Sequence, residues 1–192
     1  MSIFLKGLPT DVDMTQATVK GGPFDPDTTA YITSLYGYRD PIQDPDTGLW
    51  FPTWHTGLDM SVWPVASGVY KLHALWGGTI NHVDGTNDDN GYSVSVLSDD
   101  GQWYFEYYHL SDPPLVVPGQ LIGAGKLLGY EGTTGYSTGP HLHLGIMYQW
   151  SYVDPLPVLS MLRDLGELVP GSGYFDIEDR FHDEWAHYSP ED

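Results

Sequence analysis

A loop of small residues that runs directly into an alternating strand constrains this chain more than any other stretch. Residues 133–140 are almost all Gly, Ser, Thr and Pro, a composition typical of a loop. Residues 141–144 then alternate histidine with leucine, which indicates a strand. Side chains two positions apart share one face of a strand, so His141 and His143 point one way and the two leucines point toward a core.

The pair of His141 and His143 has more than one chemical use. Neutral imidazole is the commonest metal ligand, and it is also the commonest general acid or base near neutral pH. Two surface histidines on a strand would give the same pattern without any function. The pair alone therefore leaves open which imidazole, if either, binds a metal.

Composition favours one β-rich domain. The 192 residues are 41% hydrophobic and 14% aromatic, which supplies enough apolar side chains for a core. The 23 glycines and 15 prolines indicate many turns, as in folds made of short strands. We expect a mainly β fold, with an antiparallel sheet as the floor of a groove, one C-terminal helix and extended terminal arms.

Charge and cysteine content exclude several kinds of site. The chain has no cysteine, so disulfides and thiolate metal sites are excluded, and any metal must be held by histidine and carboxylate. The 26 acidic and 7 basic residues give a formal net charge of -19. This charge disfavours binding to nucleic acid, or to an anionic membrane, through a basic face.

The N-terminal residues and the hydropathy pattern predict neither an export signal nor a membrane span. Residues 1–9 contain a short apolar run without a basic start, so no signal peptide is expected. The chain has no run of about 18 apolar residues, so no membrane span is expected. A protein of this kind that acts outside a cell must leave it by another route.

A second candidate segment surrounds Gly57. His55 and Asp59 are four positions apart, a spacing that would place them on one face of a helix. The glycine and the β-rich flanks disfavour a helix, so a strand with a bend or bulge at Gly57 must bring the two side chains together. A turn histidine and a turn aspartate without a shared role are the alternative.

Several further strands are expected in the first two thirds of the chain. Residues 31–39 are the expected first strand, and residues 68–73 and 78–83 are expected to form a hairpin. Residues 102–110 form an aromatic-rich strand that ends at His109. A histidine at a strand end beside a turn lies where functional side chains are often found.

The chain changes character after the central strand. Asp154 is the expected cap of a helix, Pro155 lies in its first turn, and leucines then recur at helical spacing. Residues 169–173 are rich in glycine and break this pattern, which predicts a linker. The expected organisation is an arm over residues 1–30, one domain over residues 31–168, and a linker with an acidic tail over residues 169–192.

Five side chains form the candidate site: His55, Asp59, His109, His141 and His143. Two imidazoles and one carboxylate with an open fourth position are the ligand set of a catalytic zinc ion. Two further histidines would remain to transfer protons, which completes a set of groups for hydrolysis. A non-haem iron oxygenase also uses two histidines and a carboxylate, but its usual His-x-Asp spacing is absent.

The order and surroundings of these residues resemble a known family. The segments His55-x-x-x-Asp59, Tyr108-His109-Leu110 and 132–144 are similar to the motifs of the lysostaphin-like zinc metallopeptidases, which cleave peptide bonds in bacterial peptidoglycan. Residues 34–39 resemble the opening strand of that family's domain. Residues 117–123 resemble its middle hairpin, and residues 154–157 resemble its end. The resemblance covers about residues 30–160.

The resemblance implies a role for each of the five residues. It implies that the zinc ligands are His55, Asp59 and His143. It implies that the catalytic residues, which line the zinc without binding it, are His109 and His141. These two would activate the water and steady the oxyanion. Candidates for the tyrosine that some relatives use beside the zinc are Tyr36, Tyr38 and Tyr136.

The resemblance also implies a fold, a substrate and partners. A lysostaphin-like antiparallel sheet would hold the zinc in a groove, and a peptidoglycan peptide would lie along it. A leaderless member with extra arms resembles a bacteriophage lysin or a virion tail component, whose arms would dock on other tail proteins. Such a protein would be virion-associated, or else made in the cytoplasm and released to act on the cell wall. A virion module that keeps the fold without turnover is the alternative.

Overall fold

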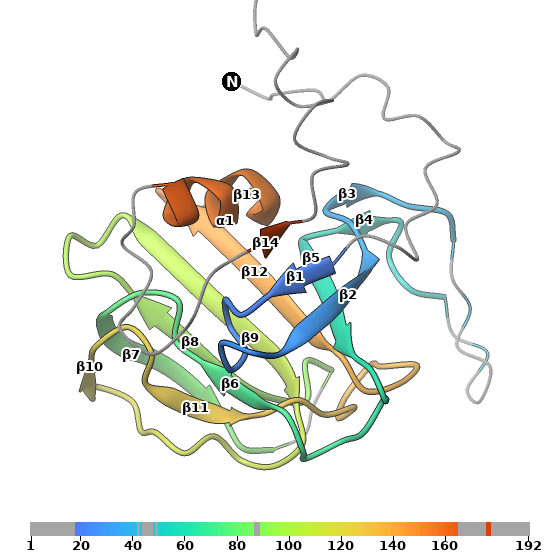
Figure 1. Cartoon of the computed structure of the whole chain (residues 1–192), viewed down its shortest axis with the longest axis horizontal. Helices are drawn as coiled ribbons and strands as arrows, with labels where there is room; N and C mark the ends of the chain where they lie inside the picture. Colours follow the sequence, from blue (N-terminus) through green and yellow to red (C-terminus); the bar gives the residue numbers. More distant parts are fainter. Residues whose placement is uncertain are drawn as a thin grey trace, which may run out of the picture.

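An antiparallel sheet forms the body of the protein (Figure 1), and the computed structural model describes residues 18–41, 43, 48, 50–86, 89–164 and 176–177. Within these residues the sheet has ten strands, in the order β10-β7-β8-β9-β12-β5-β2-β1-β14, and β13 pairs with β12. Two small sheets pair β11 with β6 and β3 with β4. The strands are β1 (Thr18–Lys20), β2 (Thr29–Ser34), β3 (Gly37–Tyr38), β4 (Trp54–His55), β5 (Gly57–Val62), β6 (Lys71–His73), β7 (Gly78–Asp84), β8 (Tyr92–Leu97), β9 (Trp103–Leu110), β10 (Leu121–Ile122), β11 (Leu127–Tyr130), β12 (Leu142–Tyr148), β13 (Ser151–Val153) and β14 (Asp176–Ile177), and the helix is α1 (Pro155–Asp164). The predicted mainly β, antiparallel fold with a C-terminal helix is confirmed.

The register of β12 decides which side chains share the face that carries the site. His143 lies opposite Asp59 of β5 on one side and opposite Tyr108 of β9 on the other. Leu142 and Leu144 point to the other face and are completely buried. The predicted alternation of histidine and leucine is therefore confirmed, and His143 meets Asp59 on one face of the sheet.

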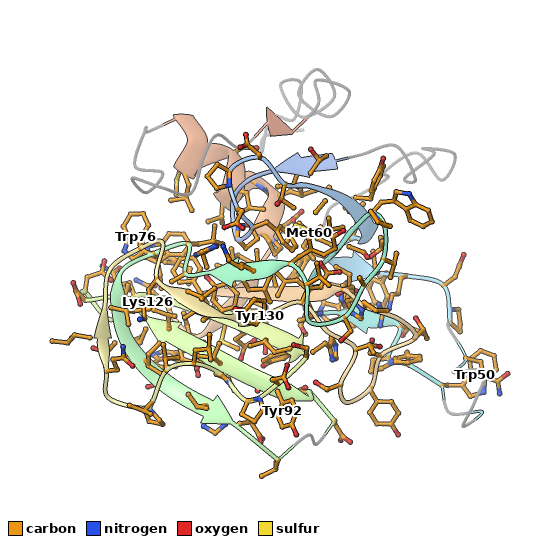
Figure 2. The ribbon with its side chains drawn as sticks, turned by 60° about the horizontal axis from the view of Figure 1, so that its bottom comes forward. Trp50, Met60, Trp76, Tyr92, Lys126 and Tyr130 are labelled. Carbon is orange, nitrogen blue, oxygen red and sulfur yellow. The ribbon has the colours of Figure 1, made fainter. Side chains whose placement is uncertain are left out.

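The opposite face of the sheet carries the hydrophobic core. Just after β6, the amide of Leu75 donates to the hydroxyl of the buried Tyr107 on β9 at 2.8 Å, which fixes the small sheet against the main one. Helix α1 packs on β12 and β5 through the buried Leu159 and Leu162. Side chains, Met60 among them, fill the interior (Figure 2). Complete burial of such a side chain contributes about 2 kcal/mol each.

The predicted hairpin between residues 68–73 and 78–83 is wrong. β6 pairs with β11, whereas β7 pairs with β8 and β10. Ala74 extends the pairing of β6 through two further backbone hydrogen bonds to the segment before β11. The chain then crosses to the main sheet at Gly78, where a Cβ would overlap the Leu97 carbonyl. The two strands thus belong to different layers.

The first described residues belong to the main sheet. β1 pairs with β2 and also with β14. The turn between β1 and β2 is tied to β6, because Nε2 of His73 lies 2.8 Å from a carboxylate oxygen of Asp25. Residues 1–17, 165–175 and 178–192 lie outside the described residues, and so does the predicted linker over residues 169–173. The division into arms, domain and tail therefore stays a prediction.

Helix α1 begins where the sequence predicts. The amide of Leu156 donates to Oδ1 of Asp154 at 3.0 Å, so Asp154 caps the helix and Pro155 takes its first position. Burial raises the pKa of the Asp154 carboxyl to about 6. Among the described residues no helix is long and apolar enough to cross a membrane.

Replacing Asp154 by alanine should lower the free energy of unfolding by about 1 kcal/mol, because the Leu156 amide loses its acceptor. Denaturant titration at pH 7 measures this loss. Asp154→Asn is the matched control, since its side-chain oxygen still accepts a hydrogen bond, and it should cost less. An equal loss in both variants would contradict the capping role.

Candidate metal and catalytic site

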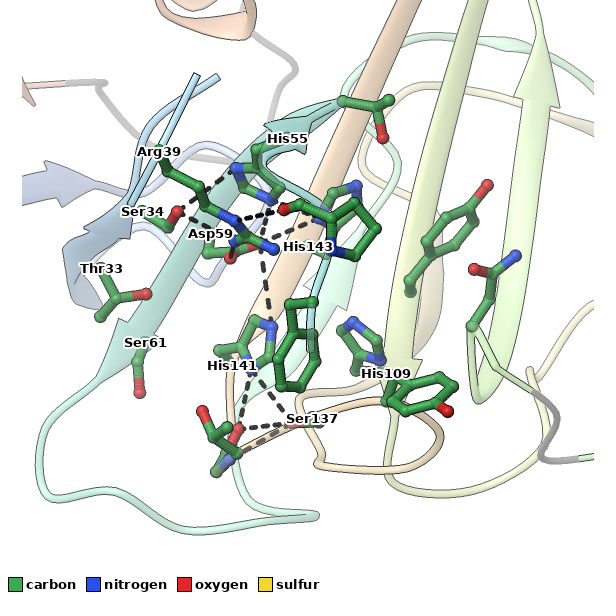
Figure 3. Close-up of a pocket in the computed structure, with 18 of the residues that line it drawn as sticks. Thr33, Ser34, Arg39, His55, Asp59, Ser61, His109, Ser137, His141 and His143 are labelled. Carbon is green, nitrogen blue, oxygen red and sulfur yellow. Dashed lines mark hydrogen bonds and ion pairs between the residues drawn. The ribbon is translucent and has the colours of Figure 1, made fainter. Parts of the chain in front are cut away.

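All five predicted site residues line one cavity of about 660 Å³ (Figure 3). The site face of β5, β9 and β12 forms its floor. Its walls include residues 50–52, 89–90 and 136–140, which lie in loops. The sheet therefore supplies a rigid base, and the loops supply the surfaces that a ligand would meet first.

Three of the five residues bring one side-chain atom each to the same point. Nε2 of His55 lies 3.0 Å from Oδ1 of Asp59 and 2.9 Å from Nδ1 of His143. Nδ1 of His143 lies 2.9 Å from the same Asp59 oxygen. His55 is 4% exposed, Asp59 8% and His143 7%, so the cluster is shielded from bulk water.

A break in the strand at Thr56 lets His55 and Asp59 meet, as expected for a bend near Gly57. β4 ends at His55, and β5 begins at Gly57. The glycine is required by space, because a Cβ there would lie 2.6 Å from Nε2 of His143 and 2.5 Å from the Leu144 carbonyl oxygen. The absence of a side chain at this position therefore makes room for the His143 ring.

A backbone carbonyl fixes the tautomer of His55. Its Nδ1 lies 2.7 Å from the carbonyl oxygen of Leu35, which can only accept, so Nδ1 carries the proton. In the neutral ring Nε2 then has a lone pair, and this lone pair points at a carboxylate oxygen of Asp59. Two acceptors at 3.0 Å repel each other unless they share a proton or a metal ion.

The position of His143 indicates that the cluster holds a metal ion and not a shared proton. One proton can link only two of the three clustered atoms, whereas a metal ion can bind all three. Ligand atoms at about 2.0–2.1 Å around a tetrahedral zinc ion lie about 3.3 Å apart, close to the separations observed here. Within the described residues His55, Asp59 and His143 are the one group that could hold a metal in this way. Their donor set and spacing fit a zinc ion.

The charge states of the cluster suit cation binding. Burial alone would raise the pKa of Asp59, but the imidazoles of His143 and His55, at 2.9 and 3.0 Å, hold it well below its usual range. Burial lowers the pKa of His143, which favours the neutral ring. Nε2 of His143 is buried and has no hydrogen-bond partner among the described residues. An anionic carboxylate and neutral imidazoles are the forms that metals bind.

Arg39 completes the cluster and was not predicted as a site residue. Its guanidinium lies 3.6 Å from the second carboxylate oxygen of Asp59 and donates to the Ser34 hydroxyl at 3.2 Å. Its Nε donates to the carbonyl of Pro52 at 3.3 Å. The sequence offers one signal, because the chain has only 7 basic residues and Arg39 is the last residue of an expected strand.

The other two predicted histidines are anchored in the same way as each other. Nδ1 of His109 lies 2.8 Å from the carbonyl of Thr134, and Nδ1 of His141 lies 2.8 Å from the carbonyl of Gly139. Each Nδ1 must therefore donate, which leaves Nε2 of each neutral ring as a proton acceptor. The two ring centroids are 4.7 Å apart, and Nε2 of His141 lies 3.8 Å from Oδ1 of Asp59.

His109 occupies an uncommon backbone conformation. Its φ of 64° falls in the left-handed region, which residues other than glycine rarely adopt. Burial lowers the pKa of His109 to about 3, so the ring is neutral at physiological pH. Because Nδ1 of this neutral ring donates to Thr134, its Nε2 is left as a hydrogen-bond acceptor.

Tyr108 also supports the cluster and was not predicted as a site residue. Its ring stacks on His143 with centroids 5.3 Å apart and planes at 10°. Burial and the nearby Glu106 carboxylate raise the pKa of its phenol, which stays protonated. Tyr152 donates to the same carboxylate at 2.9 Å. This network holds the ring that packs on His143.

The three tyrosines considered from the resemblance lie in different places. Tyr136 lines the cavity, whereas Tyr36 and Tyr38 are not among its lining residues. The hydroxyl of Tyr36 donates to the backbone carbonyl of Tyr152 at 3.1 Å. Of the three, Tyr136 alone remains a candidate for contact with a ligand.

Glu131 is a buried acid behind one wall of the cavity. It is 0% exposed, and among the described residues its Oε2 has no hydrogen-bond partner. Its Oε1 lies 3.3 Å from the Ser61 hydroxyl and 3.4 Å from the Val62 amide. The same hydroxyl donates at 2.7 Å to the carbonyl of Pro140, next to His141. Burial raises the pKa of Glu131 to about 7.

Glu131 should make folding stability depend on pH. Its folded pKa of about 7 exceeds its usual value of 4.5, so the folded state binds more protons between these values, and stability falls as pH rises through them. The ionised form carries a penalty of about 3 kcal/mol. We expect the stability of Glu131→Gln relative to the unmodified protein to increase between about pH 5 and pH 8.

Denaturant unfolding of both proteins at several pH values measures this difference. The exposed Asp99 gives the control, since Asp99→Asn removes a carboxyl group but leaves Glu131 in place. A difference between Glu131→Gln and the unmodified protein that does not change with pH would show that Glu131 stays ionised in the folded state.

Comparison with known proteins identifies relatives of this chain. Its sequence matches the model of peptidase family M23 over residues 53–155, which include all five site residues. Glycyl-glycine endopeptidase ALE-1 of Staphylococcus capitis is 36% identical over 95 residues, 46% of this chain and 25% of that protein. The chain thus spans about a quarter of the length of this curated relative.

Two solved structures carry the same fold. The catalytic domain of the antimicrobial peptidase lysostaphin from Staphylococcus simulans has a TM-score of 0.55 and 28% identity, covering 68% of this chain and 92% of that one. A mutant catalytic domain of the prophage-encoded M23 protein EnpA from Enterococcus faecalis has a TM-score of 0.51 and 27% identity, covering 70% and 91%. The predicted lysostaphin-like fold is confirmed, and the chain belongs to peptidase family M23.

Proposed function

We propose that this chain is a zinc-dependent endopeptidase that hydrolyses peptide bonds in bacterial peptidoglycan. His55, Asp59 and His143 bind the zinc, and His109 and His141 handle protons. The observation that carries this proposal is the meeting of three donor atoms within 3.0 Å. The tautomer of His55 makes that arrangement unfavourable without a shared cation.

The side chains around the cluster supply the remaining steps of hydrolysis. When bound, zinc polarises the scissile carbonyl and lowers the pKa of a coordinated water to about 7. Nε2 of His109 or His141 takes the proton of the attacking water, because each Nδ1 is already committed to a carbonyl. The protonated imidazole then donates to the developing oxyanion or to the leaving amine.

The shape of the cavity supports a peptide substrate. The sheet provides a flat floor, and wall segments on several sides leave a trough of about 660 Å³. Arg39 and the loop of residues 133–140 lie on different sides of the metal cluster. An extended peptide fits such a trough, and the bond to be cut lies over the cluster.

Removing a proposed ligand should remove metal and activity together. His143→Ala and Asp59→Asn should each lose stoichiometric zinc, measured by elemental analysis, and should lose cleavage of purified peptidoglycan. The reason is that two ligands do not retain a catalytic zinc as three do. Full zinc occupancy in His143→Ala would exclude this residue as a ligand.

Removing a proton-handling histidine should separate metal binding from turnover. His109→Ala and His141→Ala should keep zinc and lose about 100-fold to 10,000-fold in turnover. Turbidity loss of several purified peptidoglycans, with and without a chelator, measures turnover, and mass spectrometry of the released peptides names the bond. Normal turnover in either variant would remove that histidine from the mechanism.

Arg39 should tune the metal site without binding the metal. Arg39→Ala should weaken zinc affinity about 10-fold to 100-fold, because the guanidinium orients the Asp59 carboxylate. Competition with a chromogenic chelator measures this affinity. Arg39→Lys keeps the charge but loses the hydrogen bonds to Ser34 and Pro52. Its zinc affinity should lie between those of the unmodified protein and Arg39→Ala. Unchanged affinity in Arg39→Ala would contradict the role.

We also propose that the enzyme serves a bacteriophage, as a lysin or as a virion tail component that helps to penetrate the cell wall. Support comes from the similarity to the prophage-encoded EnpA domain. In a virion, the terminal segments outside the described residues would contact other tail proteins. Mass spectrometry of purified particles tests the tail role, and absence of the protein from particles would leave only the lysin role.

A catalytically silent virion module with the same fold is the alternative. It would need no zinc and would cleave no peptidoglycan. The presence of all three proposed ligands and both histidines in one cavity favours the enzyme. Zinc-loaded protein that leaves every tested wall intact would favour the module.

A further inference from the structure

Four aromatic side chains from the loops and the short strand β4 line the cavity, and they form what we call the aromatic collar: Trp50, Phe51, Trp54 and Tyr136. Trp50 is 64% exposed, Trp54 44% and Tyr136 38%, so the fold makes little use of their apolar surface. Trp50 projects at the edge of the molecule (Figure 2). Exposed aromatic groups gathered beside a groove mark a surface that binds a ligand.

Contacts between rings hold three of the four collar side chains in position: Phe51, Trp54 and Tyr136. Trp54 meets Tyr36 and Tyr38 edge-on, with centroids 5.6 and 4.9 Å apart. Phe51 and Tyr136 come from different walls and also meet edge-on, at 5.8 Å. Aromatic side chains that are already held in place lose little conformational entropy when a ligand binds.

The peptide part of the proposed substrate offers little to such platforms. Peptidoglycan peptides consist mainly of alanine, glycine, acidic and diamino residues, which have no large apolar side chain. Each sugar ring of the glycan strand instead presents a face of C–H groups, and such a face packs well on an aromatic ring. Trp and Tyr suit this contact because each joins a flat apolar face to a polar group.

The net negative charge of the protein favours a neutral ligand over an anionic one at the aromatic collar. A formal net charge of -19 opposes ionic attachment to an anionic cell wall. Stacking on an uncharged N-acetylated sugar does not depend on that charge. The collar therefore offers a way to hold the wall that the composition does not oppose.

We propose that the aromatic collar is a subsite for a sugar ring of the glycan strand, next to the peptide that is cut. This inference rests on the proposed function, because it concerns the same substrate. It makes Trp50 and Trp54 specificity-determining residues. The enzyme should then prefer a peptide that still carries its sugars over the same peptide alone.

The test compares kcat/KM on two soluble substrates with one peptide sequence, one attached to the N-acetylated disaccharide and one free of sugar. The unmodified protein should prefer the sugar-bearing substrate about tenfold, as expected for burying the C–H face of one sugar ring on an aromatic side chain. Trp50→Ala should lose most of this preference. The matched control is Trp150→Ala, since Trp150 is also 64% exposed but lies at the turn after β12 and outside the cavity lining.

Equal cleavage of both substrates by the unmodified protein would overturn the subsite and leave the endopeptidase standing. A preference that survives in Trp50→Ala would also overturn it. If neither substrate is cut, the proposed endopeptidase activity is wrong, and the sugar subsite is then tested by a binding measurement. An N-acetylglucosamine oligosaccharide is then titrated into each protein, and binding is measured by the change in tryptophan fluorescence. The unmodified protein and Trp150→Ala should bind it, whereas Trp50→Ala should not. No binding by any of them would overturn the inference.

Discussion

The pairing register of β12 is the constraint on which the site depends. His143 faces Asp59 on one side and Tyr108 on the other because β12 lies between β5 and β9. A shift of one residue would turn His143 into the core and place a leucine in the groove. The completely buried Leu142 and Leu144 oppose such a shift, so the apolar face of the sheet positions the polar one.

The cluster concentrates polar groups where the protein excludes water. Asp59 is buried, yet the neighbouring histidines hold its pKa well below its usual range, and the Arg39 guanidinium lies 3.6 Å from it. Glu131 shows the opposite outcome for a buried carboxyl, because it has only two long contacts and its pKa rises. The difference between the two acids lies in their partners, not in their depth. The fold thus gives a negative charge to the position where a cation would bind.

The sequence predicts features that depend on neighbouring residues. The alternation over residues 141–144, the cap at Asp154 and the bend near Gly57 are local, and the structure has all three. The partner of β6 depends on residues more than 50 positions away, which periodicity does not identify. Arg39 and Glu131 were not predicted for the same reason. Their roles arise from contacts with other segments, whereas their own sequence surroundings are ordinary.

The loop of residues 133–140 gives the site two parts with different mechanical properties. The proposed metal ligands belong to paired strands, whereas the rings of His109 and His141 are each held by a carbonyl of this loop. A change in the loop would alter the hydrogen bonds that orient both rings, while the strand backbone of His109 and the metal cluster stay in place. Evolution could therefore adjust proton transfer through loop residues alone, without altering the affinity for the metal.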